Sequence, residues 1–475
     1  MTDKLQKSNF VNSTSSPTQN NNVSSLNNPV ESAPSPTYSN IYSPTYPQDW
    51  QETTLGEVCE IKGGKRLPKG ETLVLEKTSH PYIRITDLEN NQIKKHQLQF
   101  VTDEAFQNIS RYIVNTGDVI VSIVGSIGFV AFIDEDLDNA SLTENCVKFV
   151  NLKNLDSKFL YYFLISKNGQ EEIAKNTVGA VQKKLPIYGV QNIQLLLPPL
   201  PEQKAIASVL SIFDDKIELL REQNKTLEEI GQTIFKEWFL PSRPSVGRKG
   251  QAGGKYGVDD LPAEASAQAG ELPEGWRVGK LGEICSLKSG FAFSGNDFVE
   301  GSNTMVLKIK DLKGDGIVDL SDISFVKDGI KDLERVQYFK LKSGDIVLAM
   351  SGNTTGKIGI IPHLEGELFL NQRVGKIFID EKIYKTFIYF FLMSGSYQEK
   401  ILAMGYGSAQ PNINPTQIEN IDIIYPDNKI LENFVNTTNP IFIKILDNLY
   451  QIQSLARNRD ELLPKLMSGQ VRAEF

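Results

Sequence analysis

The chain has 475 residues and a formal net charge of −8; 40% of its residues are hydrophobic and 23% are charged. This length suggests two or three domains, and the composition excludes a wholly disordered or collagen-like chain. The net charge has the wrong sign for binding nucleic acid through bulk charge alone, so any such contact must come from local basic patches or from a basic partner.

Residues 8–48 are dominated by Ser, Asn, Thr and Pro. Such a segment cannot bury enough apolar surface to offset the entropy of ordering, so we expect residues 1–49 to be a disordered tail. A start codon assigned too early is the alternative explanation. The first 22 residues lack the apolar core of a secretory signal, and the chain has no apolar run of about 18 residues, which favours a cytoplasmic protein.

From Trp50 onward the sequence contains an internal repeat with a period of about 227 residues, which is too long for a solenoid and suits a duplicated domain with its helix. The matches keep the same order along both copies. They include Trp50 with Trp276, Leu55-Gly56-Glu57 with Leu281-Gly282-Glu283, Cys59 with Cys285, Gly117-Asp118 with Gly344-Asp345, Gly179 with Gly407, and Asn192-Ile193 with Asn420-Ile421. We therefore expect two related domains, at residues 50–200 and 272–428.

Short β-rich runs bounded by Gly-Asp turns predict a mixed α+β fold with twisted antiparallel sheets in each copy. Apolar helices are expected at residues 159–165 and 387–393. The three cysteines, Cys59, Cys146 and Cys285, are odd in number and widely spaced, which argues against a disulfide framework or a metal site.

Each copy ends in a long helix, at residues 201–240 and 429–475, and residues 241–271 between the copies read as a flexible linker. Apolar residues at alternating spacings of four and three predict a coiled-coil seam in the first helix, and a shift of 228 residues gives a poorer seam in the second. Pro440 is expected to kink the second helix or to delay its regular part to near Ile441. The seam positions are Ile217, Leu220, Asn224, Leu227, Ile234, Ile445, Ile452, Leu455 and Leu462.

Asn224 within this seam is predicted to set the register of the two helices, because a buried polar side chain tolerates few partners. A solvated break in a long helix is the alternative for Asn224. The helices themselves could pack only on their own domains, but two similar helices at the same offset favour mutual antiparallel pairing.

Several motifs resemble one family: Leu197-Pro198-Pro199-Leu200-Pro201-Glu202-Gln203 ahead of a heptad helix, the two Gly-Asp turns, Leu370-Asn371-Gln372, and Leu462-Leu463-Pro464-Lys465-Leu466-Met467-Ser468-Gly469. In this order they resemble the DNA-specificity subunits of type I restriction-modification systems, from Trp50 to Phe475. The resemblance implies two target-recognition domains separated by two antiparallel helical spacers. It also implies a bipartite double-stranded DNA target whose gap is set by the spacers, two docked methyltransferase subunits, and restriction subunits with translocase and nuclease activity.

The sequence offers little catalytic chemistry of its own. The Asn/Asp-Pro-Pro-aromatic tetrapeptide of DNA amino-methyltransferases is absent. Residues 352–358 resemble a phosphate loop but lack one spacer residue and the Ser/Thr that would bind magnesium. The three histidines are isolated. We expect a non-catalytic subunit with no cofactor, no metal and no membrane partner.

Basic and amide side chains on predicted loops are the candidate DNA contacts, since such groups bind phosphates and base edges. They are Lys62, Lys65, Arg66, Lys69, Lys94, Lys95, Lys183, Lys184, Lys288, Lys310, Lys313, Lys357, Gln410 and Asn412. For any one of them, a solvated surface group is the alternative. For the whole chain, the alternatives are a scaffold or decoy that binds methyltransferase subunits without reading DNA, and a fused methyltransferase or nuclease.

Overall fold

The computed structural model describes residues 46–89, 91–180, 182–239, 274–312, 316–320, 322–379, 381–405 and 412–473. The predicted tail up to residue 45 and the predicted linker at 241–271 lie outside these ranges. All of the described residues fall within one compact part of the chain, Tyr46–Phe475. Among the described helices, none is both long enough and apolar enough to cross a membrane.

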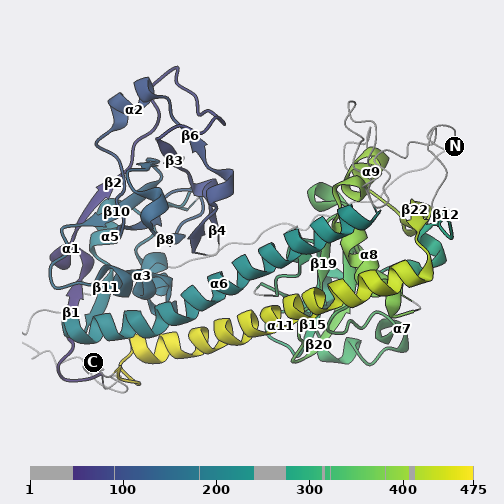
Figure 1. The fold of residues 1–475 in the computed structure, drawn as a ribbon. Coiled ribbons are helices and arrows are strands. Elements are labelled where there is room, and N and C mark those ends of the chain that lie inside the picture. The colour runs from purple at the N-terminus through teal and green to yellow at the C-terminus, as the bar shows by residue number, and fades with distance from the viewer. Residues whose placement is uncertain are drawn as a thin grey trace, which may run out of the picture. The chain divides into compact units, whose positions relative to one another are not determined.

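Two globular units of similar construction follow each other along the chain (Figure 1). The strands of the first unit are β1 (Gln51–Thr54), β2 (Glu60–Gly63), β3 (Pro81–Ile83), β4 (Leu88–Glu89), β5 (Gln92–Ile93), β6 (Gln99–Phe100), β7 (Val119–Ser122), β8 (Val130–Phe132), β9 (Ser141–Leu142), β10 (Cys146–Val150) and β11 (Gln194–Leu197). Its helices are α1 (Leu55–Val58), α2 (Asp103–Ile109), α3 (Ser157–Ile165), α4 (Lys167–Lys175) and α5 (Ile187–Gln191).

A four-stranded antiparallel sheet, in the order β2-β10-β7-β8, is the centre of the first unit. Both of its faces are covered. Val119 and Val121 of β7 belong to the core shared with the helices, whereas Ile120 points to a second core on the opposite face. Burial on both faces explains why β7 reads as a continuous apolar run, because alternation appears only when one face is solvated.

The second unit repeats this plan. Its strands are β12 (Arg277–Lys280), β13 (Cys285–Ser289), β14 (Phe298–Val299), β15 (Thr304–Leu307), β16 (Gly316–Ile317), β17 (Ser324–Val326), β18 (Ile346–Ala349), β19 (Ile358–Ile360), β20 (Glu367–Leu370), β21 (Val374–Ile379) and β22 (Asp422–Tyr425). Its helices are α7 (Glu334–Gln337), α8 (Ile383–Met393), α9 (Gly395–Gly405) and α10 (Pro415–Glu419). The central sheet has the order β13-β21-β18-β19-β16, so its first four strands correspond to those of the first unit. The predicted α+β fold class is thus confirmed.

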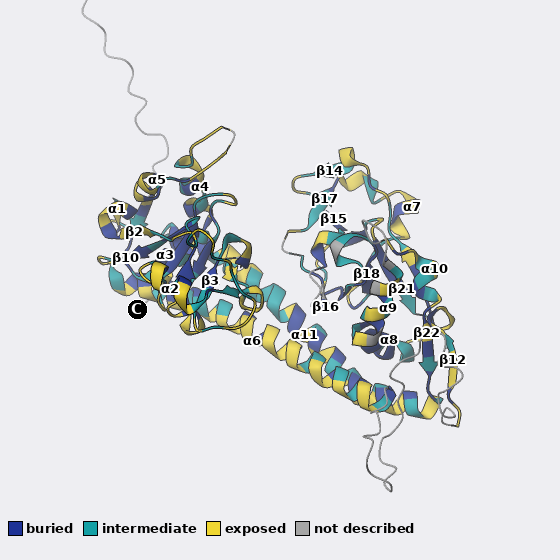
Figure 2. Cartoon of the chain, turned by 90° about the horizontal axis from the view of Figure 1, so that it is seen from above, coloured by how far each residue is buried: buried dark blue, intermediate teal, exposed yellow. Residues whose placement is uncertain are grey.

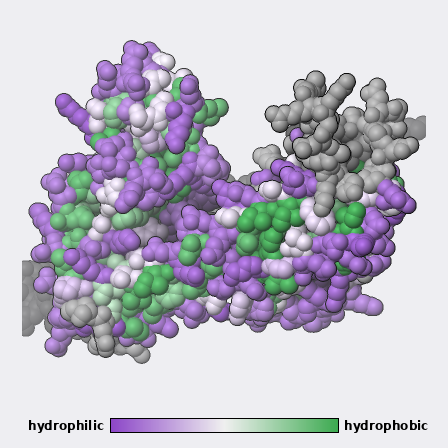
Figure 3. Space-filling model, in the orientation of Figure 1, coloured by the Kyte–Doolittle hydropathy of each residue, from purple (hydrophilic) through white to green (hydrophobic). Residues whose placement is uncertain are grey.

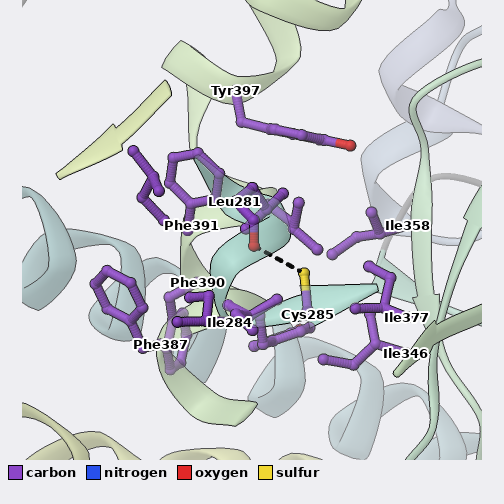
Figure 4. Packing of buried hydrophobic residues seen from close by; sticks show 14 of the residues in the cluster. Leu281, Ile284, Cys285, Ile346, Ile358, Ile377, Phe387, Phe390, Phe391 and Tyr397 are labelled. Atoms are coloured by element: carbon purple, nitrogen blue, oxygen red, sulfur yellow. Dashed lines mark hydrogen bonds between the residues drawn. The ribbon is translucent and has the colours of Figure 1, made fainter. Parts of the chain in front are cut away.

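Buried side chains fill the interior of both units (Figure 2). In the second unit, Cys285 lies among aromatic and aliphatic residues, and its thiol faces the carbonyl of Leu281 at 3.5 Å (Figure 4). The equivalent Cys59 thiol donates to the carbonyl of Leu55 at 3.0 Å in the first unit. The repeated Leu-Gly-Glu-x-Cys motif is therefore part of a repeated core.

Helices α6 (Leu200–Phe239) and α11 (Asn428–Met467) pack against each other, each with 40 residues and hence about 60 Å long at 1.5 Å per residue. They run antiparallel. The start of α6 and the end of α11 complete the core of the first unit with Leu210 and Leu466, and the other two ends complete the core of the second with Phe235 and Phe434. Each end of the helix pair is therefore part of the core of one unit.

The predicted effect of Pro440 on the start of the second helix is wrong. α11 begins at Asn428, and Pro440 lies inside it. Proline removes one backbone donor, and here it stands on the exposed side of the helix. On the buried side, Phe434 and Ile445 are fully buried in the core on either side of this turn. Tertiary packing stabilises the helix beyond what the local sequence favours.

Candidate nucleic-acid interface

A pocket of about 240 Å³ lies at the edge of the central sheet of the first unit. Lys62 of β2, Lys148 of β10, and Arg111 and Tyr112, which follow α2, are among the residues that line it. Lys65, two residues after the end of β2, places its Nζ 5.6 Å from the centre of the Tyr112 ring. Three of the seven residues that line the pocket are therefore cationic, and Ile113 and Leu142 are among the others.

The two lysines of this pocket lie side by side on one face of the sheet, because Lys148 pairs directly with Lys62 in the antiparallel ladder. Like charges in this arrangement repel. Asp118 offsets Lys148 through an ion pair of 2.9 Å between two mostly buried side chains. The same carboxylate accepts the backbone N–H of Asn115 at 2.9 Å, so the aspartate of the Gly-Asp turn both closes the turn and holds the lysine.

The second unit has the same lysine pair. Lys288 of β13 lies opposite Lys376 of β21, and Lys376 binds Asp345 at 2.6 Å. Here the surroundings are aromatic: Lys288 lies 5.1 Å from the ring of Tyr338, and Tyr338 stacks on Phe378. In both units, the aspartate of the Gly-Asp motif thus binds a lysine of the central sheet.

Other predicted contacts of the first unit are already paired within the protein. Arg66 donates to Glu144 at 2.6 Å; burial disfavours the charged form of Glu144, but Arg66 outweighs it and the pKa of Glu144 is lowered. Lys94 forms an ion pair with Glu89, and Lys95 binds Asp134 and Asp136 at 2.7 and 2.6 Å. Binding DNA through these three cations would require competition with their carboxylates. Lys69 is exposed.

Lys183 and Lys184 lie on a hairpin that begins at Val178, whose backbone exchanges two hydrogen bonds of 2.9 Å with Lys184. Both lysines are exposed, and neither forms an ion pair with a described residue. A bridge between Val124 and Lys184 fixes the hairpin to the end of β7. An equivalent bridge joins Ser351 to Asn412 in the second unit, so Asn412 occupies the matching position.

The remaining predicted contacts of the second unit differ in their surroundings. Lys310 forms an ion pair with Asp322 and also donates to its backbone carbonyl at 2.6 Å. Lys357 is partly buried in the turn before β19. Lys313 and Gln410 lie outside the described residues.

All nine predicted seam positions of α6 and α11 are buried or partly buried. Ile217, Leu220, Asn224 and Ile445 are at most 4% exposed. The partly buried positions are Leu227, Ile234, Ile452, Leu455 and Leu462. At the middle of the pair, the Nδ2 of Asn448 donates to the Oδ1 of Asn224 at 2.8 Å. The polar position predicted in α6 therefore meets a polar residue of α11.

Each unit also docks a tyrosine hydroxyl onto a carboxylate of α6. Tyr162 donates to Asp214 at 2.7 Å, and the same carboxylate receives Arg459 of α11 at 2.6 Å. Burial, together with Asp214, raises the pKa of Tyr162. In the second unit, Tyr389 donates to Glu228 at 3.0 Å. These contacts link the units to the helix pair.

The Pro-Glu-Gln motif at the start of α6 has a structural explanation. Glu202 is fully buried and accepts hydrogen bonds from the indole of Trp50 at 3.1 Å and from Arg472 at 2.8 Å. Gln203, also fully buried, donates to the carbonyls of Asn154 and Pro198. The motif joins the start of the first unit, its last strand and the segment after α11.

Two cations of the pocket were not among the sequence-predicted contacts, namely Arg111 and Lys148. Lys148 lies inside an apolar strand, and only its agreement with Lys376 across the repeat could have signalled it. In the described part of the chain, no group of His, Cys, Asp and Glu could hold a metal ion.

Comparison with known proteins identifies the family. Residues 47–229 and 273–463 each match the model of the type I restriction modification DNA specificity domain. The chain is 27% identical over 435 residues to the type I restriction enzyme MjaIX specificity subunit of Methanocaldococcus jannaschii, covering 90% of this chain and 95% of that protein. It is 26% identical over 479 residues to the HindI specificity subunit of Haemophilus influenzae, covering 89% of this chain and all of that protein.

A similar solved structure is that of the S subunit of a type I restriction-modification system from M. genitalium, with a TM-score of 0.48 and 21% identity over 88% of this chain and 96% of that one. The HsdS subunit from Thermoanaerobacter tengcongensis has a TM-score of 0.31 and 17% identity, covering 90% of this chain and 98% of that one. The two segments matched by the family model make up more than half of the chain, which therefore belongs to the type I restriction-modification DNA specificity family.

Proposed function

We propose that this chain selects the DNA sequence for a type I restriction-modification assembly. Each globular unit reads one half of a bipartite double-stranded site, and the paired helices set the unread gap between the halves. The observation that carries the proposal is the repeated unit-plus-helix plan, matched twice by one family model. Because the two units have diverged, the two half-sites can differ, which gives an asymmetric target.

In this proposal, residues 50–200 and 272–428 are the recognition domains, and residues 201–240 and 429–475 are the spacers. Sequence is read from base edges and DNA shape, while the basic side chains contact phosphates and position the protein. Methylation and cleavage would be performed by partner subunits in the cytoplasm, and this chain would contribute no catalytic group.

The outer faces of the helices are the proposed docking surface for two methyltransferase subunits, with restriction subunits recruited beyond them. Ile212, Leu219 and Ile230 follow one line along α6, since spacings of 7 and 11 residues return to the same side of a helix. They are 64%, 46% and 44% exposed, and Ile443 and Tyr450 of α11 are similarly exposed. Figure 3 shows hydrophobic surface over the helix pair among hydrophilic side chains. Exposed apolar patches of this kind are typical of protein interaction sites.

The test is to co-purify the chain with a candidate methyltransferase subunit and to sequence methylated adenines in a host that expresses both. A split motif with a fixed gap that disappears when this chain is omitted supports the proposal. Exchanging residues 50–197 with those of a relative should then change one half-site only. A stable complex without methylation would favour the scaffold alternative, and a change of both half-sites would contradict the split reader.

A further inference from the structure

The pocket at the sheet edge of the first unit carries more positive charge than the protein itself neutralises. Three cations line it, Lys62, Arg111 and Lys148, with Lys65 beside Tyr112. Asp118 is engaged with Lys148 at 2.9 Å, and Glu60 lies 3.6 Å from Lys62, with both of those side chains more than half exposed. Pairs exposed to this degree are weak, so most of the charge of Lys62 stays available.

Arg111 differs from the two lysines of the pocket in its lack of a carboxylate partner among the described residues. It is exposed, and it forms no ion pair with any described residue. A guanidinium presents a planar set of donors that matches the oxygens of a phosphate. Lys62 and Lys148 line the same pocket, so three of its lining residues are possible donors to one small anion, although Lys148 is already paired with Asp118. The pocket volume of about 240 Å³ leaves room for a phosphate group.

The second unit has the same pair of lysines but a different residue at the position of Arg111. Its lysine pair, Lys288 and Lys376, is retained, but Gln337 stands directly before Tyr338, where the first unit has Arg111 before Tyr112. Gln337 donates to the carbonyl of Lys331, and Lys288 lies over the two stacked rings. The lysine pair therefore belongs to the shared fold, whereas the arginine before the tyrosine in the first unit is a glutamine in the second.

We propose that this pocket binds one phosphodiester phosphate of the DNA backbone beside the first half-site, with Arg111 as its principal ligand. This rests on the function proposed above. A phosphate contact carries no sequence information, so its loss should weaken binding to cognate and unrelated DNA by the same factor. The contact would fix the position of the first unit on the duplex.

The experiment measures the affinity of the full chain, in its methyltransferase assembly, for duplex DNA by fluorescence anisotropy over a range of KCl concentrations. Arg111→Gln should reduce the slope of log affinity against log salt by about 0.9, the value for one lost phosphate contact. Arg277→Gln is the matched control, because it removes the same charge from an exposed arginine that is already paired with Glu283 at 2.6 Å. Its slope should equal that of the wild type.

Single methylphosphonate substitutions locate the contact, since each removes one backbone charge. The wild type should be sensitive at one position that Arg111→Gln no longer senses. If the slope is unchanged in Arg111→Gln while the wild type binds DNA, the pocket is not a phosphate site, but the proposed function still stands. Inorganic phosphate that binds the pocket without any effect of Arg111→Gln on DNA would also overturn the proposed phosphate contact. Absence of DNA binding by the wild type would reject both.

Discussion

Replacing the central asparagine pair of the helices tests whether a polar contact sets their register. Asn224 and Asn448 are at most 1% exposed and share one hydrogen bond of 2.8 Å. Within the described chain, the Oδ1 of Asn448 has no hydrogen-bond partner, so the pair is only partly satisfied. Leucine has a similar size and no polar atoms, which makes it the appropriate replacement.

Each single change, Asn224→Leu or Asn448→Leu, leaves the other amide buried without its main partner. An orphaned polar group of this kind costs about 1–3 kcal/mol. The double change removes both polar groups and should be more stable than either single variant, close to or above the wild type. In thermal melting, each kcal/mol corresponds to about 2–4 °C for a domain of 150–250 residues.

The four chains form a double-mutant cycle, and the coupling between the two changes should be about as large as the two single-variant losses added together and opposite in sign. Neutral single variants, or a double variant with the summed loss, would refute the reasoning. Register is the second readout. Without the polar pair, adjacent registers become closer in energy, so the double variant should methylate sites with more than one gap length.

Two further substitutions and one labelling experiment test the packing. Tyr162→Phe removes a hydrogen bond to the Asp214 carboxylate and should lower the free energy of unfolding by about 1.5–3 kcal/mol, measured by urea denaturation. Gly231→Ala should cost about 1–3 kcal/mol in the same assay, because the new Cβ would lie 2.1 Å from a ring carbon of a buried phenylalanine. Burial raises the pKa of Cys59 and Cys146 to about 12, so at pH 8 both thiols should stay protonated and react with iodoacetamide only after unfolding. Rapid labelling of the native chain would contradict that burial.

The duplicated plan could be predicted because it is written twice at one offset. Matched pairs such as Trp50 with Trp276 need no knowledge of contacts, and the spacing of apolar residues predicts both long helices. The behaviour of Pro440 could not be predicted, because its tolerance depends on the core that covers the other side of α11. Local propensity is a weak guide where tertiary packing is extensive.

The candidate interface was harder to predict, because a lysine in the sequence does not show its partner. Lys95 and Lys183 look alike as loop cations, yet the first binds two carboxylates and the second forms no ion pair with a described residue. Arg111 and Lys148 line the same pocket because the segment that follows α2 lies beside the central sheet. Such juxtapositions are long-range, so only the folded chain reveals them.

The core of the first unit includes Leu463, Leu466, Met467 and Ala473, although its own strands end before residue 200. During synthesis, roughly 270 more residues must be made before this core can close, which takes on the order of 14–54 s at about 5–20 residues per second. The apolar surface that these residues later cover stays open throughout that interval. We therefore expect the first unit to be the part of the nascent chain most dependent on chaperones, and a ribosome that stops early to leave it prone to proteolysis.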